Sequence, residues 1–196
     1  MIKKLLITSA FLANLWADTP AEDRDGWTLF EWMETALMGE WTLSPETAQT
    51  GTESYRHPAL KALVGTDRTG MAYKYIGRET TIQEDLLPDT AKQMVTMYHC
   101  KDIACTTLKA THYCTKQNQP EFIANLNEST PERFVFDCDM TTELCRSRED
   151  HVHTIIHELS QEGRHLKSSY LSWKDGKPNT VHSIYHFDRR VPDPGQ

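Results

Sequence analysis

The 196-residue chain lacks several features by which proteins are commonly classified. After residue 17, no apolar run approaches the ~20 residues of a membrane-spanning helix, so no membrane span is expected. Lys and Arg form neither a patch nor a stripe, and the net charge is −7, which argues against a nucleic-acid partner. No internal repeat or low-complexity segment is present, so a repeat architecture is not expected. No C-x2-C spacing occurs, which disfavours metal ligation by all the cysteines.

The first 17 residues have the organisation of a secretory signal peptide. Lys3 and Lys4 form a basic start, residues 5–16 an apolar run, and Ala17 a small residue at a plausible cleavage point. We therefore expect export to the periplasm or the extracellular space, with the mature chain beginning near Asp18. Loss of the two lysines lowers Lys+Arg from 21 to 19 against 28 Asp+Glu, a net charge of −9 that favours solubility.

The length and the 38% hydrophobic content suit one well-buried domain. Asp25 is a candidate N-cap for a helix that Gly39 ends, so residues 18–38 are assigned to a linker and this helix. From 39 to 190, short β-rich runs alternate with Gly, Pro, Asp and Asn. The pattern predicts an all-β fold, a closed antiparallel barrel of about ten strands with the helix near one mouth, followed by a tail at 191–196. The expected strands are 39–44, 71–77, 79–87, 92–100, 105–114, 120–126, 132–138, 151–159, 164–174 and 179–190.

Five cysteines in an exported chain predict two disulfides and one odd thiol. Cys100 and Cys105 bracket four residues between two strand-like runs, as expected for facing positions near a hairpin tip. Cys138 and Cys145 bracket six polar residues in the same manner. Cys114 is left unpaired.

The Cys100–Cys105 pairing also predicts which hairpin residues face inward. If these two cysteines lie opposite each other, the more apolar face of the hairpin should point into the barrel. His112 and Cys114 share the parity of that face, so both are expected to point inward. The inward face carries Val95, Met97, Leu108 and Ala110, and the outward face carries Thr96, Tyr98, Thr107 and Lys109.

The segment 111–114, followed by Asn118 and Gln119 before a proline, places an imidazole, a phenol, a thiol and two amides at a strand end. His112 and Cys114 are two residues apart on one face, so the imidazole could activate the thiol. A core histidine beside a buried, apolar cysteine is the alternative. The two amides suit either a turn, where they bond backbone groups, or the rim of a cavity.

His151 and His153 form a second candidate cluster. Imidazoles at positions i and i+2 on one strand face can hold a metal ion together. The alternative is a structural or solvated pair. No metal or cofactor is assigned, and these two histidines are the candidate ligands should a metal bind.

The second half of the chain resembles a group of bacterial secreted proteins with a lipocalin-like (calycin-type) β-barrel and no established reaction. The matching pieces are "MVTMYH" at 94–99, "THYC" at 111–114, "NQP" at 118–120, "HVH" at 151–153 and "SW…DGK" at 172–177. Gly39-Glu40-Trp41, with Arg189-Arg190 near the end of the chain, is similar to the calycin Gly-x-Trp opening and its Arg partner. In that superfamily the Arg packs over the Trp and closes one barrel end. The resemblance implies a barrel with a cavity.

We interpret the chain as an exported barrel that binds or carries a small, mainly apolar ligand. Two alternatives remain: a metal- or thiol-dependent barrel enzyme of unknown substrate, which we do not favour, and a structural envelope protein without a ligand. Tyr98 is retained as a candidate on its motif alone, because the facing argument turns it outward. No catalytic residue is assigned; ligand identity, the oligomeric state and the structure of 45–70 stay open. The expected ligand contacts are His112, Cys114, Tyr98, Asn118, Gln119, His151, Trp41, Trp173 and Arg190.

Overall fold

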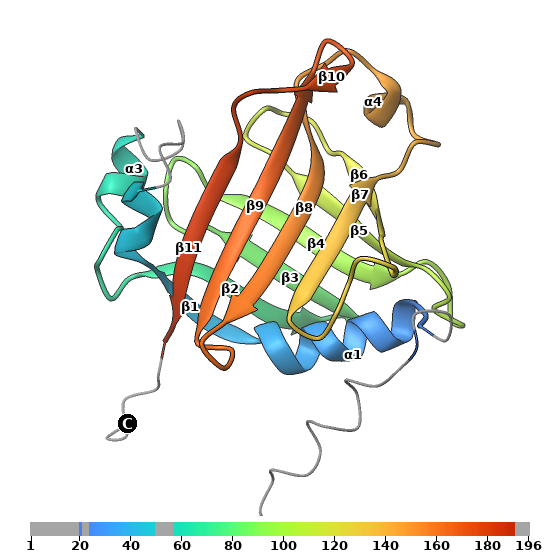
Figure 1. Ribbon diagram of the computed structural model, residues 1–196, viewed down its shortest axis with the longest axis horizontal. Coiled ribbons are helices and arrows are strands. Elements are labelled where there is room, and N and C mark those ends of the chain that lie inside the picture. Colours follow the sequence, from blue (N-terminus) through green and yellow to red (C-terminus); the bar gives the residue numbers. More distant parts are fainter. Residues whose placement is uncertain (1–19, 21–23, 50–56, 191–196) are drawn as a thin grey trace, which may run out of the picture.

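A computed structural model of the protein describes residues 20, 24–49 and 57–190 (Figure 1). The expected signal peptide at 1–17 and the tail at 191–196 lie outside the described residues. Within the described ranges, no helix is long and apolar enough to span a bilayer.

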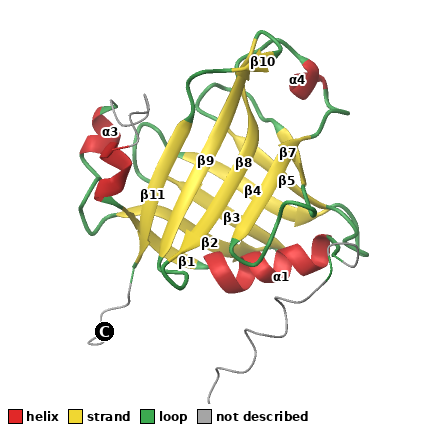
Figure 2. Ribbon diagram, viewed as in Figure 1, coloured by secondary structure: helices red, strands yellow, loops and turns green. Residues whose placement is uncertain are grey.

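The described chain forms a closed antiparallel barrel of ten strands, with an eleventh strand outside it (Figures 1 and 2). Each strand pairs with the next along the chain from β1 to β9, and β11 lies between β9 and β1. The β8–β9 pairing closes the barrel, while β10 pairs only with β9. The predicted fold class is confirmed. The strands are β1 (Gly39–Leu43), β2 (Thr69–Ile76), β3 (Thr81–Leu86), β4 (Met94–Cys100), β5 (Leu108–Tyr113), β6 (Glu121–Ala124), β7 (Arg133–Cys138), β8 (His151–Ser160), β9 (His165–Lys174), β10 (Lys177–Pro178) and β11 (Ser183–Arg189).

The helix α1 (Gly26–Leu37) covers one end of the barrel (Figure 2). Asp25 caps it as expected, because its carboxylate accepts a hydrogen bond from Thr28 N at 2.8 Å. Position 26 requires glycine, because a Cβ there would lie 2.5 Å from the backbone N of Leu108. The apolar face of the helix thus becomes part of the core. In the described part of the chain, three shorter helices lie in connections between strands: η3 (Pro45–Gln49), α3 (Pro58–Lys61) and α4 (Glu143–Arg146).

Trp41 anchors the same end of the barrel. It is fully buried, its Nε1 donates to Leu37 O at 2.9 Å, and the guanidinium of Arg189 lies 4.1 Å from the centre of its ring. Arg189 also donates to backbone carbonyls at the end of α1, which ties the helix to β11. Arg189, and not Arg190, therefore stacks on the tryptophan; Arg190 is exposed and pairs with Glu40 at 2.6 Å.

The β4–β5 hairpin corrects the expected facing. Cys100 pairs in the ladder with Leu108, not with Cys105, which lies in the connection with a left-handed φ of 47°. The observed pairing differs from the predicted one by three residues. Because three is an odd number, the inward and outward faces of β4 are exchanged relative to the prediction. Thr96 and Tyr98, predicted to face outward, are fully buried. The prediction was right for β5, where alternate burial turns His112 inward with Leu108 and Ala110.

Both predicted disulfides are confirmed. Cys100 bonds to Cys105 with a Cα–Cα distance of 4.8 Å, and Cys138 bonds to Cys145 with a distance of 5.7 Å. Cys114 is free and half-buried.

Candidate ligand pocket

The barrel contains a cavity of about 760 Å³ at the end away from α1. Its lining comes from β strands and from the connections that follow β1, β3, β5, β7 and β9. The helix instead packs on the β4–β5 connection, where Trp27 N donates to Cys105 O at 3.1 Å. In an antiparallel barrel these two sets of connections lie at opposite ends, so α1 closes one end and the cavity opens at the other.

Below the cavity, Glu84 of β3 is fully buried and surrounded by donors. The donors come from strands on several sides of the barrel, and each is oriented by the alternation of its strand. They are Thr96 Oγ1 (2.9 Å) and the Tyr170 hydroxyl (2.7 Å) at Oε1, and the Tyr98 hydroxyl (2.7 Å), the Tyr73 hydroxyl (3.1 Å) and His157 Nε2 (3.2 Å) at Oε2. Such a set of donors satisfies a carboxylate without water.

These donors determine the protonation state of the network. Burial alone would raise the pKa of Glu84, but the interaction with His157 and the hydrogen bonds from Tyr170 and Tyr98 lower it to about 2. Burial and the negative charge of Glu84 raise the pKa of each surrounding tyrosine well above the usual value for a phenol. These tyrosines are Tyr73, Tyr98 and Tyr170. At neutral pH the network is therefore a carboxylate held by phenol groups that donate.

The tautomer of His112 follows from this network. An ionised Glu84 only accepts, so the Thr96 hydroxyl donates to it. Thr96 Oγ1 then accepts from His112 Nδ1–H, 2.9 Å away. Burial lowers the pKa of His112 to about 4, against the opposing effect of Glu84, so the ring is neutral at pH 7. Its Nε2 is therefore a bare acceptor.

Among the described residues that line the cavity, His112 Nε2 is a buried polar atom without a hydrogen-bond partner. It is buried, and no hydrogen bond reaches it from the described residues. The His112 side chain lines the cavity beside Tyr170, whose ring centre is 5.6 Å from the imidazole. Tyr170 is fixed from behind by Glu84. His112 and Tyr170 on the floor of the cavity are thus held by hydrogen bonds, and the floor presents one unused acceptor.

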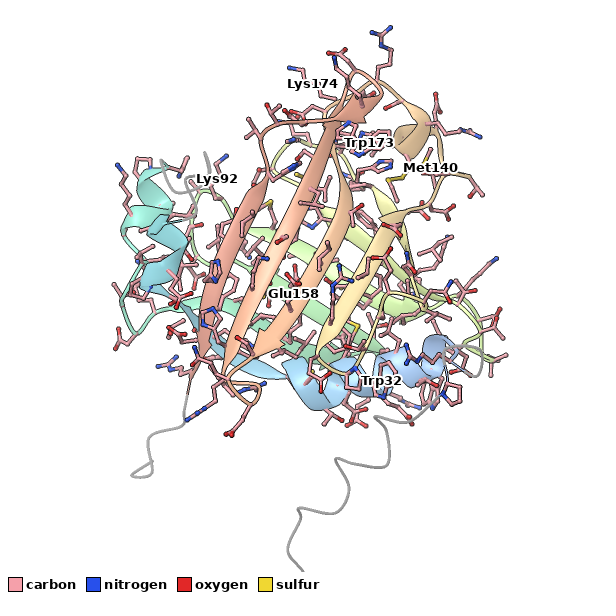
Figure 3. All side chains as sticks on the ribbon, in the orientation of Figure 1. Trp32, Lys92, Met140, Glu158, Trp173 and Lys174 are labelled. Carbon is pink, nitrogen blue, oxygen red and sulfur yellow. A yellow bond between two sulfur atoms is a disulfide. The ribbon has the colours of Figure 1, made fainter. Side chains whose placement is uncertain are left out.

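The mouth of the cavity is basic. Lys92, Lys116 and Lys174 all line it, and Figure 3 shows Lys174 at the end of the molecule opposite Trp32 of α1. Lys116 pairs with Asp150, whereas Lys92 and Lys174 have no salt bridge to the described residues. The apolar part of the lining includes Leu60, Met94, Val152 and Val181.

Of the residues predicted to contact a ligand, only His112 and Cys114 line the cavity. Tyr98 lies below it, bonded to Glu84. Asn118 bonds the backbone O of Asp150 through Nδ2 at 3.1 Å, and Gln119 is exposed, so both amides belong to the strand connection. Trp41 and Arg190 lie at the opposite end, as described above.

His151, His153 and Trp173 lie together outside the cavity lining. His151 Nδ1 donates to Glu149 O at 2.8 Å, so its Nε2 accepts from His153 Nδ1 at 3.1 Å. His153 stacks on Trp173 with ring centres 3.9 Å apart. Cys138 Sγ lies within 4.8 Å of both histidines, but it is bonded to Cys145 and offers no thiolate.

Sequence reasoning missed Glu84 and most of its partners. One usable signal was present: Glu84 alternates with Ile82 and Leu86 on β3, so a lone carboxylate shares a face with two apolar residues. A carboxylate in that position requires buried donors.

Comparison with protein-family models, curated proteins and solved structures gives no match for this chain. Its function is therefore inferred from its own geometry.

Proposed function

We propose that this protein is an exported barrel that binds a small, mainly apolar ligand in the cavity described above. The ligand carries a hydrogen-bond donor at its inner end and an anionic group at the mouth. The observation that carries this proposal is His112 Nε2, a buried acceptor without a partner on the cavity floor. Export is supported by the two disulfides, which are typical of oxidising compartments. The resemblance to secreted lipocalin-like proteins stays a prediction.

The inner end of the ligand is inferred from the protonation of His112. A buried acceptor left unsatisfied costs about 1–3 kcal/mol, so the site favours a group that donates to it. A hydroxyl or N–H group can donate to His112 Nε2. A carboxylate only accepts hydrogen bonds, so its oxygens would repel the lone pair of this nitrogen. The neighbouring Tyr170 cannot supply the bond, because its proton is used by Glu84.

The rest of the ligand is inferred from the walls and the mouth. Side chains such as Met94 and Val152 favour an apolar body, as in most small-molecule sites. Lys92 and Lys174 at the mouth favour an anionic end, since neither forms a salt bridge within the described residues. An ω-hydroxylated fatty acid has this combination of groups.

A binding role is better supported than a thiol enzyme. His112 Nε2 has no hydrogen-bond partner, so it is not bonded to Cys114 Sγ. The other imidazole nitrogen is occupied by Thr96. Thr96 thus orients the imidazole, but the imidazole does not meet the Cys114 thiol as a base must meet its nucleophile.

The first test is native mass spectrometry of freshly purified protein, which should show a retained small molecule.

The second test is calorimetric titration with ω-hydroxydodecanoate and dodecanoate. We expect the hydroxylated acid to bind about tenfold more tightly, the value of one hydrogen bond. The preference should vanish in His112→Phe, while dodecanoate still binds. Absence of a retained ligand together with no binding of either acid would contradict the proposal.

A matched variant tests the mouth separately. Lys174→Gln should weaken both acids and leave the preference for the hydroxylated one intact. The control is Lys74→Gln, which removes an exposed lysine outside the cavity lining and should alter neither the affinity nor the preference. If the wild-type protein bound the two acids with equal affinity, the role of His112 would be refuted, but binding in the cavity would not.

A further inference from the structure

A second cluster of potential ligand atoms lies on the outer wall of the barrel. It consists of Glu46 on η3, His165 on β9 and His186 on β11, none of which lines the cavity. His165 is buried, His186 is half-buried and Glu46 is exposed. We propose that this cluster binds a divalent transition-metal ion, with zinc as the best match to its donor set.

The three ligand atoms have the spacing that zinc requires. His165 Nε2 lies 3.0 Å from His186 Nδ1, and Glu46 Oε2 lies 3.5 Å from each of these nitrogens. A tetrahedral ion with bonds of ~2.0–2.1 Å holds its ligands about 3.3–3.4 Å apart. The triangle therefore matches one face of a zinc tetrahedron with little movement. The exposure of Glu46 leaves the fourth position to solvent.

Asp188 supplies the outer contact that metal-binding histidines usually have. Its Oδ1 lies 2.9 Å from His165 Nδ1, on the ladder position directly opposite. The carboxylate fixes the Nδ1–H tautomer and directs the bare Nε2 of His165 toward the other two ligands. Without metal, His186 Nδ1–H donates to that Nε2, so metal binding moves the proton of His186 to its Nε2.

The loop that carries Glu46 is fixed to the strand that carries His186. Ser44 N and Thr47 Oγ1 both donate to His186 O, at 2.8 and 2.9 Å. His186 N donates to Thr47 Oγ1 at 2.8 Å. Little ordering of the backbone is therefore needed when the ion binds, which removes a common cost of metal binding.

The local charge also suits a cation. Glu46 and Asp188 place two carboxylates at the cluster, while Lys167 is the cation that faces His186. Lys167 is paired with Glu158 at 2.9 Å, which offsets its repulsion. Among the described residues, the ligand atoms grouped with the His151–His153 pair include no carboxylate, and the nearby sulfur is in a disulfide, so this pair is the weaker candidate.

The full-length protein, freed of metal with EDTA, would be titrated with ZnCl2 by calorimetry and with CoCl2 by visible absorption. We expect one equivalent of zinc and the visible bands of tetrahedral cobalt. Glu46→Gln alters an exposed side chain and should weaken zinc binding at least tenfold, as should His186→Ala. Asp188→Ala touches no ligand atom and should weaken it about 10–100-fold.

The paired control is His151→Ala/His153→Ala, which should leave the affinity and the cobalt spectrum unchanged. Far-ultraviolet circular dichroism would verify that each variant is folded. The inference is overturned by the absence of stoichiometric zinc, by zinc binding that survives both Glu46→Gln and His186→Ala, or by loss of binding in the paired control. Each result is independent of whether the cavity binds a fatty acid.

Discussion

The substitution Glu84→Gln tests the buried network most sharply. Gln has the shape of Glu84 but no charge, and its amide nitrogen cannot accept from the hydroxyl donors around it. The lowering of the Glu84 pKa from 4.5 to about 2 corresponds to about 3 kcal/mol in favour of the ionised folded state. This agrees with the about 3–5 kcal/mol that removal of one partner from a buried charge network costs.

We therefore expect Glu84→Gln to lower the free energy of unfolding by about 3 kcal/mol at pH 7. In a domain of this size the melting temperature should fall by about 6–12 °C. Urea denaturation followed by tryptophan fluorescence measures the change. The control is Glu121→Gln, because Glu121 is about half exposed and pairs with Lys109 only at 3.4 Å. It should cost less than about 1 kcal/mol.

The pH dependence supplies a second readout. A carboxylate whose pKa is lower in the folded state stabilises the protein above its ordinary pKa, and this stabilisation is lost as the pH falls. The difference between wild type and Glu84→Gln should thus be full above pH 4.5 and shrink toward pH 2. An effect below about 1 kcal/mol at pH 7, or a difference that grows on acidification, would refute the assignment of Glu84 as an ionised hub.

Three further variants test the barrel itself by urea denaturation. Gly26→Ala should destabilise by about 1–3 kcal/mol, because its Cβ would meet the backbone N of Leu108; an unchanged midpoint would mean that α1 does not pack there. Trp41→Ala should cost about 3–5 kcal/mol, and a loss below 1 kcal/mol would contradict its role in closing the barrel end. Replacing Cys100 and Cys105 together by Ser should cost about 2 kcal/mol, since the closed loop is short; complete unfolding would contradict this.

The fold was largely predictable because its signals are local. The capping residue Asp25, the β-rich runs and the short cysteine spacings each act within a few residues, and the structure confirms the helix, the barrel and both disulfides. The failure on β4 arose because the prediction placed Cys105 in the ladder. A disulfide requires only that two Cα atoms approach, so it does not define a register.

The site was only partly predictable because its contacts are long-range. His112 could be turned inward from the alternation of β5 alone, and this was correct. Glu84 meets His157 and Tyr170 from β8 and β9, and that meeting depends on how the barrel closes. The cluster of Glu46, His165 and His186 likewise combines three segments that no motif connects.

The central claim is that His112 presents a bare acceptor nitrogen to the cavity. Its most direct test is the ¹⁵N NMR shifts of the His112 ring, measured with and without ω-hydroxydodecanoate. The structure predicts a neutral ring at pH 7 with a protonated Nδ1 and an unprotonated Nε2, which becomes charged only near pH 4. Added ligand should shift Nε2 and leave Nδ1 in place. A ring protonated at Nε2 at pH 7, in the free protein, would contradict the account.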